Sequence, residues 1–320
     1  MAKKKKIKKQ VYYFLIFIAL CIALAIYGKN KYDEYLYQQT YEYKLEEHGY
    51  TKSDVETLLE TFKEDKDRDF FLENPQNDNY LKIINEKYFL LNNFYKYIEY
   101  LNNNPKENIP NIIRTINIHL DSKFYELNLE TDINKDTSML VNKYYLLTKD
   151  YEPTDLVNIP GKYAWGENRR TRKIVYDAFL EMWKEANKAG HYLMVNSAYR
   201  TYEEQEIVYN NYKKQGTKYA DSYAARPGAS EHQTGLALDI FSKYNTNRKT
   251  FTDSEEAKWL KENAHNFGFL LRYPPELDDI TGYSFESWHY RYVGKELATY
   301  IYNNNITFDE YYAYFIEKGL

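Results

Sequence analysis

The segment GASEHQTGLALDI, residues 228–240, sets two polar side chains in an apolar, strand-like run. Polarity alternates toward its end, which predicts a strand with leucine and isoleucine side chains on one face and Asp239 on the other. His232 comes shortly before Gly235, and the glycine permits a tight turn that brings the imidazole back beside the strand. The segment therefore requires a sheet with an apolar face and a polar site opposite.

A second strand is predicted for WHYRYVG, residues 288–294, where His289 points away from the face that carries the aromatic side chains. Two imidazoles and one carboxylate, from His232, His289 and Asp239, are a donor set that suits zinc when a fourth position stays open for water. Glu286 belongs to the turn before this strand, near the predicted metal and not necessarily bound to it. Residues of these types also occur at such spacings by chance, and Asp239 could simply cap a loop, so the spacing alone leaves the metal site as one of two interpretations.

The N-terminus begins with the lysine-rich stretch MAKKKKIKKQ and continues with a charge-free apolar run, Val11–Tyr27. This run is at the short end of what spans a bilayer, and the lysines favour a cytoplasmic N-terminus. We predict an uncleaved single-pass anchor with the rest of the chain outside the membrane. The alternative is a signal peptide cleaved at Ala23–Ala25, which would release a secreted protein.

The composition excludes several functional classes. Cys21 is the only cysteine and lies in the apolar run, so the exported part has neither a disulfide nor a cysteine nucleophile. No serine begins an S-x-x-K motif, which argues against a serine-type penicillin-binding enzyme. A net charge of −4 without a pooled basic patch gives no reason to expect nucleic acid. We expect a self-sufficient domain in a Gram-positive-type envelope, with its oligomeric state open.

The chain is predicted to have three parts. Residues 1–30 form a cytoplasmic basic tail and membrane anchor, residues 31–120 a helical extracellular spacer or accessory region, and residues 121–320 the domain with the metal site. Near the start of the middle part, SDVE at 53–56 has capping-box spacing, and apolar residues then recur with a helical period. The last part intersperses helices with short strands without a regular βαβ repeat, which predicts an α+β fold.

Four motifs resemble those of zinc D-alanyl-D-alanine carboxypeptidases of the VanY type. SEHQTGLALDI and ESWHYRYVG resemble that family's S-x-H-x-x-G-x-A-x-D and E-x-W-H pair. SAYRTYEEQ, residues 197–205, resembles its S-x-Y-R element, and LVNKYYLLTKDYEPTDLV, residues 140–157, resembles the segment with which its domain starts. The order and separation of all four fit the family, and the resemblance covers about residues 130–320.

The resemblance implies one zinc ion per chain, bound by His232, Asp239 and His289, with Glu286 as catalytic base. It implies that Arg200 binds the substrate or polarises its carbonyl. It also implies the fold shared by these peptidases and the Hedgehog signalling domain, a small and mostly antiparallel sheet flanked by helices.

The implied reaction is removal of the C-terminal D-Ala from peptidoglycan stem peptides. Removal from D-Ala-D-Ala is favoured; an L,D-carboxypeptidase acting on tetrapeptides and a non-catalytic cell-wall-binding protein on the same fold are the alternatives. Glu286 argues against the latter, because a binding module needs no general base. Ser230 and Gln205 match positions that line the family's substrate pocket, although local hydrogen bonding explains them equally well. Glu231 is expected to be a solvated surface residue.

Overall fold

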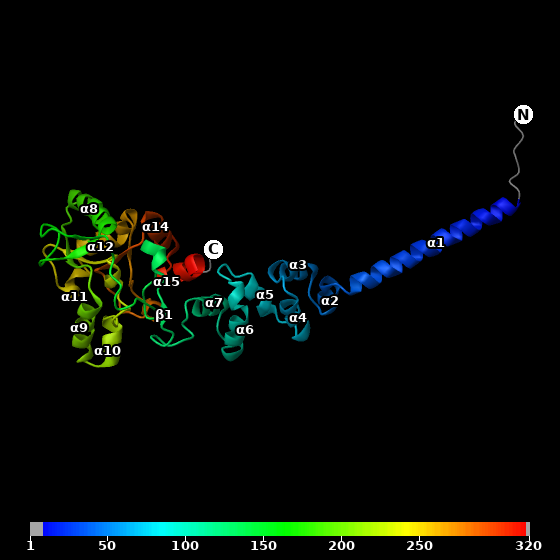
Figure 1. The fold of residues 1–320 in the computed structure, drawn as a ribbon, viewed down its shortest axis with the longest axis horizontal. Helices are drawn as coiled ribbons and strands as arrows, with labels where there is room; N and C mark the ends of the chain where they lie inside the picture. Colours follow the sequence, from blue (N-terminus) through cyan, green and yellow to red (C-terminus); the bar gives the residue numbers. More distant parts are fainter. Residues whose placement is uncertain (1–8, 318–320) are drawn as a thin grey trace, which may run out of the picture. The chain divides into compact units, whose positions relative to one another are not determined.

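The computed structural model describes residues 9–317, so most of the predicted basic tail lies outside the described residues. The chain divides into two compact units, Met1–Phe94 and Tyr95–Leu320. Figure 1 shows the elements of both units in chain order.

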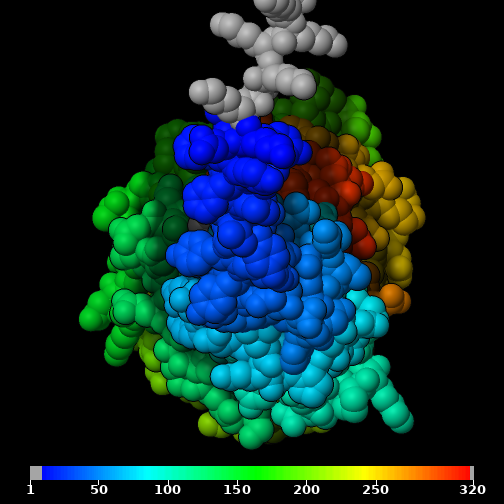
Figure 2. All heavy atoms as spheres, turned by 90° about the vertical axis from the view of Figure 1, so that its right-hand side faces the viewer, coloured from blue at the N-terminus to red at the C-terminus, as the bar shows by residue number. Residues whose placement is uncertain are grey.

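Helix α1, Lys9–Gln38, contains the predicted membrane anchor. None of its residues is buried, and Figure 2 shows its side chains uncovered in blue. Its 30 residues make it about 45 Å long at about 1.5 Å per residue, longer than the hydrocarbon core of a bilayer. The helix is long and apolar enough to cross a membrane, and a signal sequence at this position would meet the same criteria.

The remainder of the first unit is helical, as predicted. Its elements are α2 (Tyr41–Glu47), α3 (Lys52–Thr61), α4 (Asp65–Glu73), α5 (Asp78–Ile84) and the short 3₁₀ helix η1 (Leu91–Asn93). The predicted capping box at 53–56 is wrong by two residues. Thr51 is the N-cap: its hydroxyl accepts from the Asp54 backbone N–H, and the Asp54 carboxylate accepts from the Thr51 N–H. Both spacings satisfy the same pattern, and the hydrogen bonds select the earlier one.

The second unit mixes helices with short strands. Its helices are α6 (Phe94–Asn103), α7 (Ile109–Asn117), η2 (Ile133–Ser138), α8 (Lys173–Lys188), α9 (Tyr202–Lys213), α10 (Thr217–Tyr223), η3 (Glu231–Thr234), α11 (Arg248–Phe251), α12 (Glu255–Asn263), η4 (Ala264–Phe267), α13 (Asp278–Thr281), α14 (Lys295–Asn304), α15 (Phe308–Tyr311) and η5 (Tyr312–Glu317). Its strands are β1 (Leu129–Glu130), β2 (Tyr145–Leu146), β3 (Leu156–Asn158), β4 (Arg170–Arg172), β5 (Leu193–Ser197), β6 (Ala237–Ser242), β7 (Phe269–Leu271) and β8 (His289–Tyr292).

The main sheet has four strands in the order β5-β6-β8-β7, and every neighbouring pair is antiparallel. Two further pairs, β1 with parallel β2 and β3 with antiparallel β4, lie outside it. The expected α+β architecture with a small, mostly antiparallel sheet is confirmed. In the view of Figure 1, helices α8, α12 and α14 lie at the top of this unit, and α9 and α10 at the bottom.

The apolar face of the sheet is buried against α8. Val175, Phe179 and Met182 of α8 belong to one core cluster with Leu238 and Ile240 of β6. The predicted alternation is therefore confirmed, since Asp239 points to the opposite side of the same strand. One face of the sheet supplies the core, which leaves the other face free to carry the polar site.

Candidate metal centre

The pairing of neighbouring strands brings the predicted metal ligands together. Asp239 of β6 is the direct cross-strand partner of His289 of β8. His232 lies in η3, which ends at Gly235 in the left-handed conformation with φ 66°. This turn returns the chain to the start of β6, so the glycine has the role predicted from the sequence.

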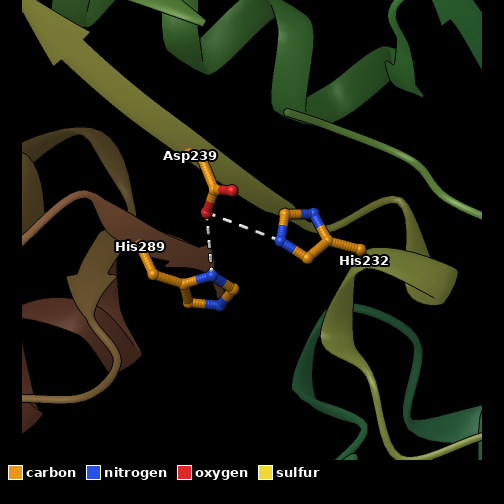
Figure 3. A group of neighbouring side chains, drawn as sticks. All are labelled: His232, Asp239 and His289. Carbon is orange, nitrogen blue, oxygen red and sulfur yellow. Dashed lines mark hydrogen bonds and ion pairs between the residues drawn. The ribbon is translucent and has the colours of Figure 1, made fainter. Parts of the chain in front are cut away.

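The three side chains converge on one point (Figure 3). Asp239 Oδ1 lies 3.1 Å from His289 Nδ1 and 3.5 Å from His232 Nε2. One donor atom from each residue lies within 4.8 Å of the others, and all three residues are buried. The predicted ligand set is thus assembled in space, although its residues come from separate parts of the chain.

The hydrogen bonds around the two imidazoles determine which ring nitrogens face the centre. His232 Nδ1 lies 2.7 Å from the Ala198 carbonyl oxygen, an acceptor, so Nδ1 carries the proton and Nε2 keeps a lone pair. His289 Nε2 lies 3.2 Å from Glu231 Oε2, and its Nδ1 lies 3.1 Å from Asp239 Oδ1, so each ring nitrogen faces a carboxylate oxygen. When His289 Nδ1 carries no proton, two nitrogen lone pairs and a carboxylate oxygen point at one another. Three acceptors in that arrangement need a cation, and nitrogen and oxygen donors of this kind fit zinc.

Glu231 is not the surface residue expected from the sequence, because it is 1% exposed. Its Oε1 accepts hydrogen bonds from Arg272 Nε at 2.8 Å and Arg291 Nη1 at 3.0 Å. Burial favours the neutral acid, but the two arginines and His289 hold the pKa of Glu231 well below its usual range. The carboxylate is therefore ionised and fixes the ring of a predicted metal ligand. Two arginines within apolar strand-like segments are the one sequence signal that could have indicated such a partner, and the prediction for Glu231 did not use it.

The ion-pair network continues from Glu231 into the C-terminal helices. Arg272 donates two hydrogen bonds to Asp309 of α15, from Nη1 at 2.6 Å and from Nη2 at 3.1 Å. Asn142 Nδ2 donates to the same carboxylate at 2.8 Å. Arg272 thus bridges two buried carboxylates, and the C-terminal helix α15 is connected through it to the metal centre.

Glu286 lies beside the predicted ligands. Its Oε2 is 3.9 Å from His289 Nδ1, and its side chain is 16% exposed. Burial raises the pKa of Glu286 to about 7, and the Asp239 charge acts in the same direction. A carboxyl group with such a pKa can both take and release a proton near neutral pH, as a general base and acid must.

The imidazoles respond differently to their surroundings. Burial lowers the pKa of His232, and the nearby Arg200 guanidinium lowers it further. Burial alone would also lower the pKa of His289, but its hydrogen bonds to Asp239 and Glu231 raise it to about 9. His232 is therefore neutral, the state a metal ligand requires, whereas His289 holds a proton in the metal-free protein that a bound cation would displace.

The remaining predicted site residues lie around the same pocket, which also contains the three predicted ligands. Arg200 is held by Gln205 Oε1, which accepts from its Nη1, and by Ser197 Oγ, which accepts from its Nη2 at 2.9 Å. The other end of the Gln205 amide donates to the Ala225 carbonyl at 2.7 Å. Gln205 therefore positions Arg200 and has both ends of its amide engaged. Ser230 is buried in the pocket wall.

Several residues of the pocket wall were not predicted from the sequence. Tyr273 stacks on His289 with ring centroids 4.9 Å apart, and Trp288, Tyr212 and Arg248 also line the pocket. Arg248 and Tyr212 come from segments without a recognisable motif, so only the fold brings them to the site.

This arrangement defines a class of protein. Two imidazoles and a carboxylate around one point, with a buried carboxyl of raised pKa beside them, are the parts of a metal-dependent hydrolase that activates water. Comparisons with known proteins narrow the class to a family.

Residues 168–295 match the profile of VanY, D-alanyl-D-alanine carboxypeptidase. The chain is 41% identical to YodJ of Bacillus subtilis (strain 168) over 191 residues, which cover 58% of this chain and 70% of YodJ. It is similar to the structure of the LD-carboxypeptidase LdcB, with 41% identity and a TM-score of 0.51, over 55% of this chain and 85% of that one. A VanY D,D-pentapeptidase mutant in complex with Zn(II) is 33% identical, with a TM-score of 0.48, over 55% and 98% of the two chains.

The chain belongs to the VanY D-alanyl-D-alanine carboxypeptidase family. The enzyme class expected from the sequence, a carboxypeptidase of this family, is thereby confirmed, and the donor atoms of His232, Asp239 and His289 fit the expected zinc.

We expect Glu231→Gln to weaken zinc binding by about ten- to a hundredfold, as loss of a carboxylate behind a histidine ligand does. The neutral amide no longer compensates Arg272 and Arg291, and it holds the His289 ring less firmly. Competition with a chromogenic chelator on the folded full-length protein measures the affinity. Glu310→Gln is the control, because Glu310 is also buried but bonds to Thr307 in the C-terminal region. Wild-type affinity in Glu231→Gln would contradict the assigned role.

Proposed function

We propose that this protein is a zinc-dependent carboxypeptidase that removes the C-terminal D-Ala from peptidoglycan stem peptides, with D-Ala-D-Ala ends favoured. The observation that carries the proposal is the convergence of three metal donors beside a buried carboxyl group of raised pKa. Membership of the VanY family supports the D,D reaction. The likeness to LdcB, an LD-carboxypeptidase, makes removal of D-Ala from tetrapeptides the second candidate.

One zinc ion per chain would be held by His232 Nε2, Asp239 and His289 Nδ1, the atoms that face one another in the structure. Zinc in such a site supplies Lewis acidity, which polarises a carbonyl and makes water nucleophilic near neutral pH.

Glu286 is the proposed proton carrier. Its carboxylate takes the proton of the attacking water and then gives it to the amine nitrogen of the departing D-Ala. Burial of this side chain raises the pKa of its carboxyl group to about 7. A pKa near neutrality allows the group both to accept and to donate the proton. The donor atoms that lie within 4.8 Å of one another belong to His232, Asp239 and His289 and not to Glu286, which supports a role as base rather than as ligand.

Arg200 is the proposed contact for the substrate's terminal carboxylate or its scissile carbonyl. Its guanidinium is held in place by Ser197 and Gln205, so it is already oriented before a ligand arrives. A guanidinium can bind a carboxylate through two parallel hydrogen bonds, which gives the pocket a preference for chain ends. Ser230, in the same wall, is the proposed neighbour of that contact.

We further propose that α1 anchors the protein in the cell membrane with the catalytic part outside, in a Gram-positive-type envelope. Residues 1–30 would be tail and anchor, residues 31–120 a spacer, and residues 121–320 the carboxypeptidase domain. The length and apolar composition of α1 support this proposal.

Metal content provides the first test. We expect the full-length protein to hold one zinc ion, and His232→Ala and His289→Ala to lose both zinc and activity. His265→Ala is the matched control, since His265 stacks on Tyr302 outside the cluster. Elemental analysis and mass spectrometry of a pentapeptide and a tetrapeptide stem are the readouts. Full activity in protein that chelation has freed of metal would contradict the proposal.

Glu286→Gln separates binding from chemistry. This variant should keep its zinc and lose about 10²–10⁴ in kcat, because the amide cannot accept the proton of water. Asp279→Asn, a change at an exposed carboxylate nearby in the chain, should retain wild-type kcat. Loss of zinc from Glu286→Gln would show that Glu286 is a ligand or a structural residue instead.

Orientation in the membrane is tested on intact protoplasts. Added protease should digest the catalytic part while α1 stays with the membrane. Digestion only after lysis would place the catalytic part in the cytoplasm, and release into the medium with a new N-terminus near Ile26 would identify a cleaved signal peptide.

A further inference from the structure

Arg248 is a second guanidinium at the pocket that the mechanism above does not use. Its guanidinium carbon lies 4.9 Å from the centre of the Trp288 ring, and its Nη1 donates to the Tyr212 hydroxyl at 2.7 Å. Trp288 directly precedes His289, and all three of these side chains line the pocket that holds the metal donors. Arg248 is thus fixed at the pocket by stacking and by a hydrogen bond, although it remains open to solvent.

Arg248 is also a cation without an acidic partner. Within residues 9–317, no carboxylate oxygen lies within 4.0 Å of Arg248 or of Arg200. By contrast, Arg272 and Arg291 share Glu231, and Arg226 pairs with Asp221. The two arginines of the pocket are therefore available to an anionic ligand.

The charges of the pocket indicate how many carboxylates that ligand carries. Among the predicted ligands, only Asp239 brings a negative charge to a bound divalent cation, and Glu231 is already compensated by Arg272 and Arg291. The charges of Arg200 and Arg248 remain. A peptide has one terminal carboxylate, so a second must come from the acyl side of the scissile bond.

We propose that Arg248 binds a side-chain carboxylate on the acyl side of the stem peptide, so that the enzyme prefers acidic substrates to amidated or basic ones. The inference rests on the proposed carboxypeptidase function and adds a specificity-determining residue to it. Trp288 and Tyr212 position the guanidinium, which lowers the ordering cost of binding.

The test uses N-acetylated peptides that end in X-D-Ala-D-Ala or in X-D-Ala, whichever series is hydrolysed faster. X is glutamate, glutamine or lysine, so the peptides differ only in one side-chain group. For the wild type we expect kcat/KM to favour glutamate over glutamine by about tenfold, at the low end for a charged hydrogen bond because Arg248 is exposed. Lysine should be poorest, and added salt should reduce the preference.

Arg248→Gln should bring the glutamate peptide down to the level of the glutamine peptide. Lys249→Gln is the matched control: it removes the same charge from the next residue of α11, which does not line the pocket, and should keep the preference. Equal rates on all three peptides in the wild type, or a full preference for glutamate in Arg248→Gln, would overturn this inference and leave the proposed carboxypeptidase function standing. Hydrolysis of none of the peptides would overturn the proposed function and the inference with it.

Discussion

The metal centre depends on the ion pairs that Glu231 makes with two buried arginines. Charges removed from water cost several kcal/mol each unless they are paired, and here Arg272 and Arg291 both donate to one carboxylate oxygen. The other oxygen lies 3.2 Å from His289 Nε2 and holds that ring in position. Removal of one member of such a network costs about 3–5 kcal/mol because the remaining charges stay buried. Stability of the core and geometry of the site thus rest on the same contacts.

The requirement that buried charges be paired separates the structural arginines of this protein from the functional ones. Arg272 and Arg291 are wholly buried and fully compensated, so they hold elements together. Arg200 and Arg248 reach the pocket and have no carboxylate partner within 4.0 Å in the described part of the chain. A guanidinium that lines a pocket and has no carboxylate partner can bind an anionic group of a ligand.

The local sequence pattern predicted which way side chains face within a strand, but it did not predict contacts between distant segments. The faces of the strands around Asp239 and His289 were predicted correctly, because the side-chain period of a strand fixes them. Their direct pairing depends on contacts between distant segments, and the family resemblance, not the periodicity, linked the two. Glu231 was misjudged because its arginine partners are 41 and 60 residues away. The role of Arg248 was missed because its contacts, Trp288 and Tyr212, are distant in the sequence, and no local motif contains all three residues.

The most direct test of the account is whether the enzyme requires a free chain end. The zinc-loaded full-length protein is given a stem peptide ending in D-Ala and the C-terminal amide of the same peptide, and kcat/KM is measured for each by mass spectrometry. The account predicts loss of a single D-Ala from the acid and about ten- to a hundredfold slower cleavage of the amide, since a charged hydrogen bond contributes about 1.5–3 kcal/mol. Arg200→Lys should narrow that difference. Equal turnover of acid and amide by the wild type would contradict the carboxypeptidase assignment.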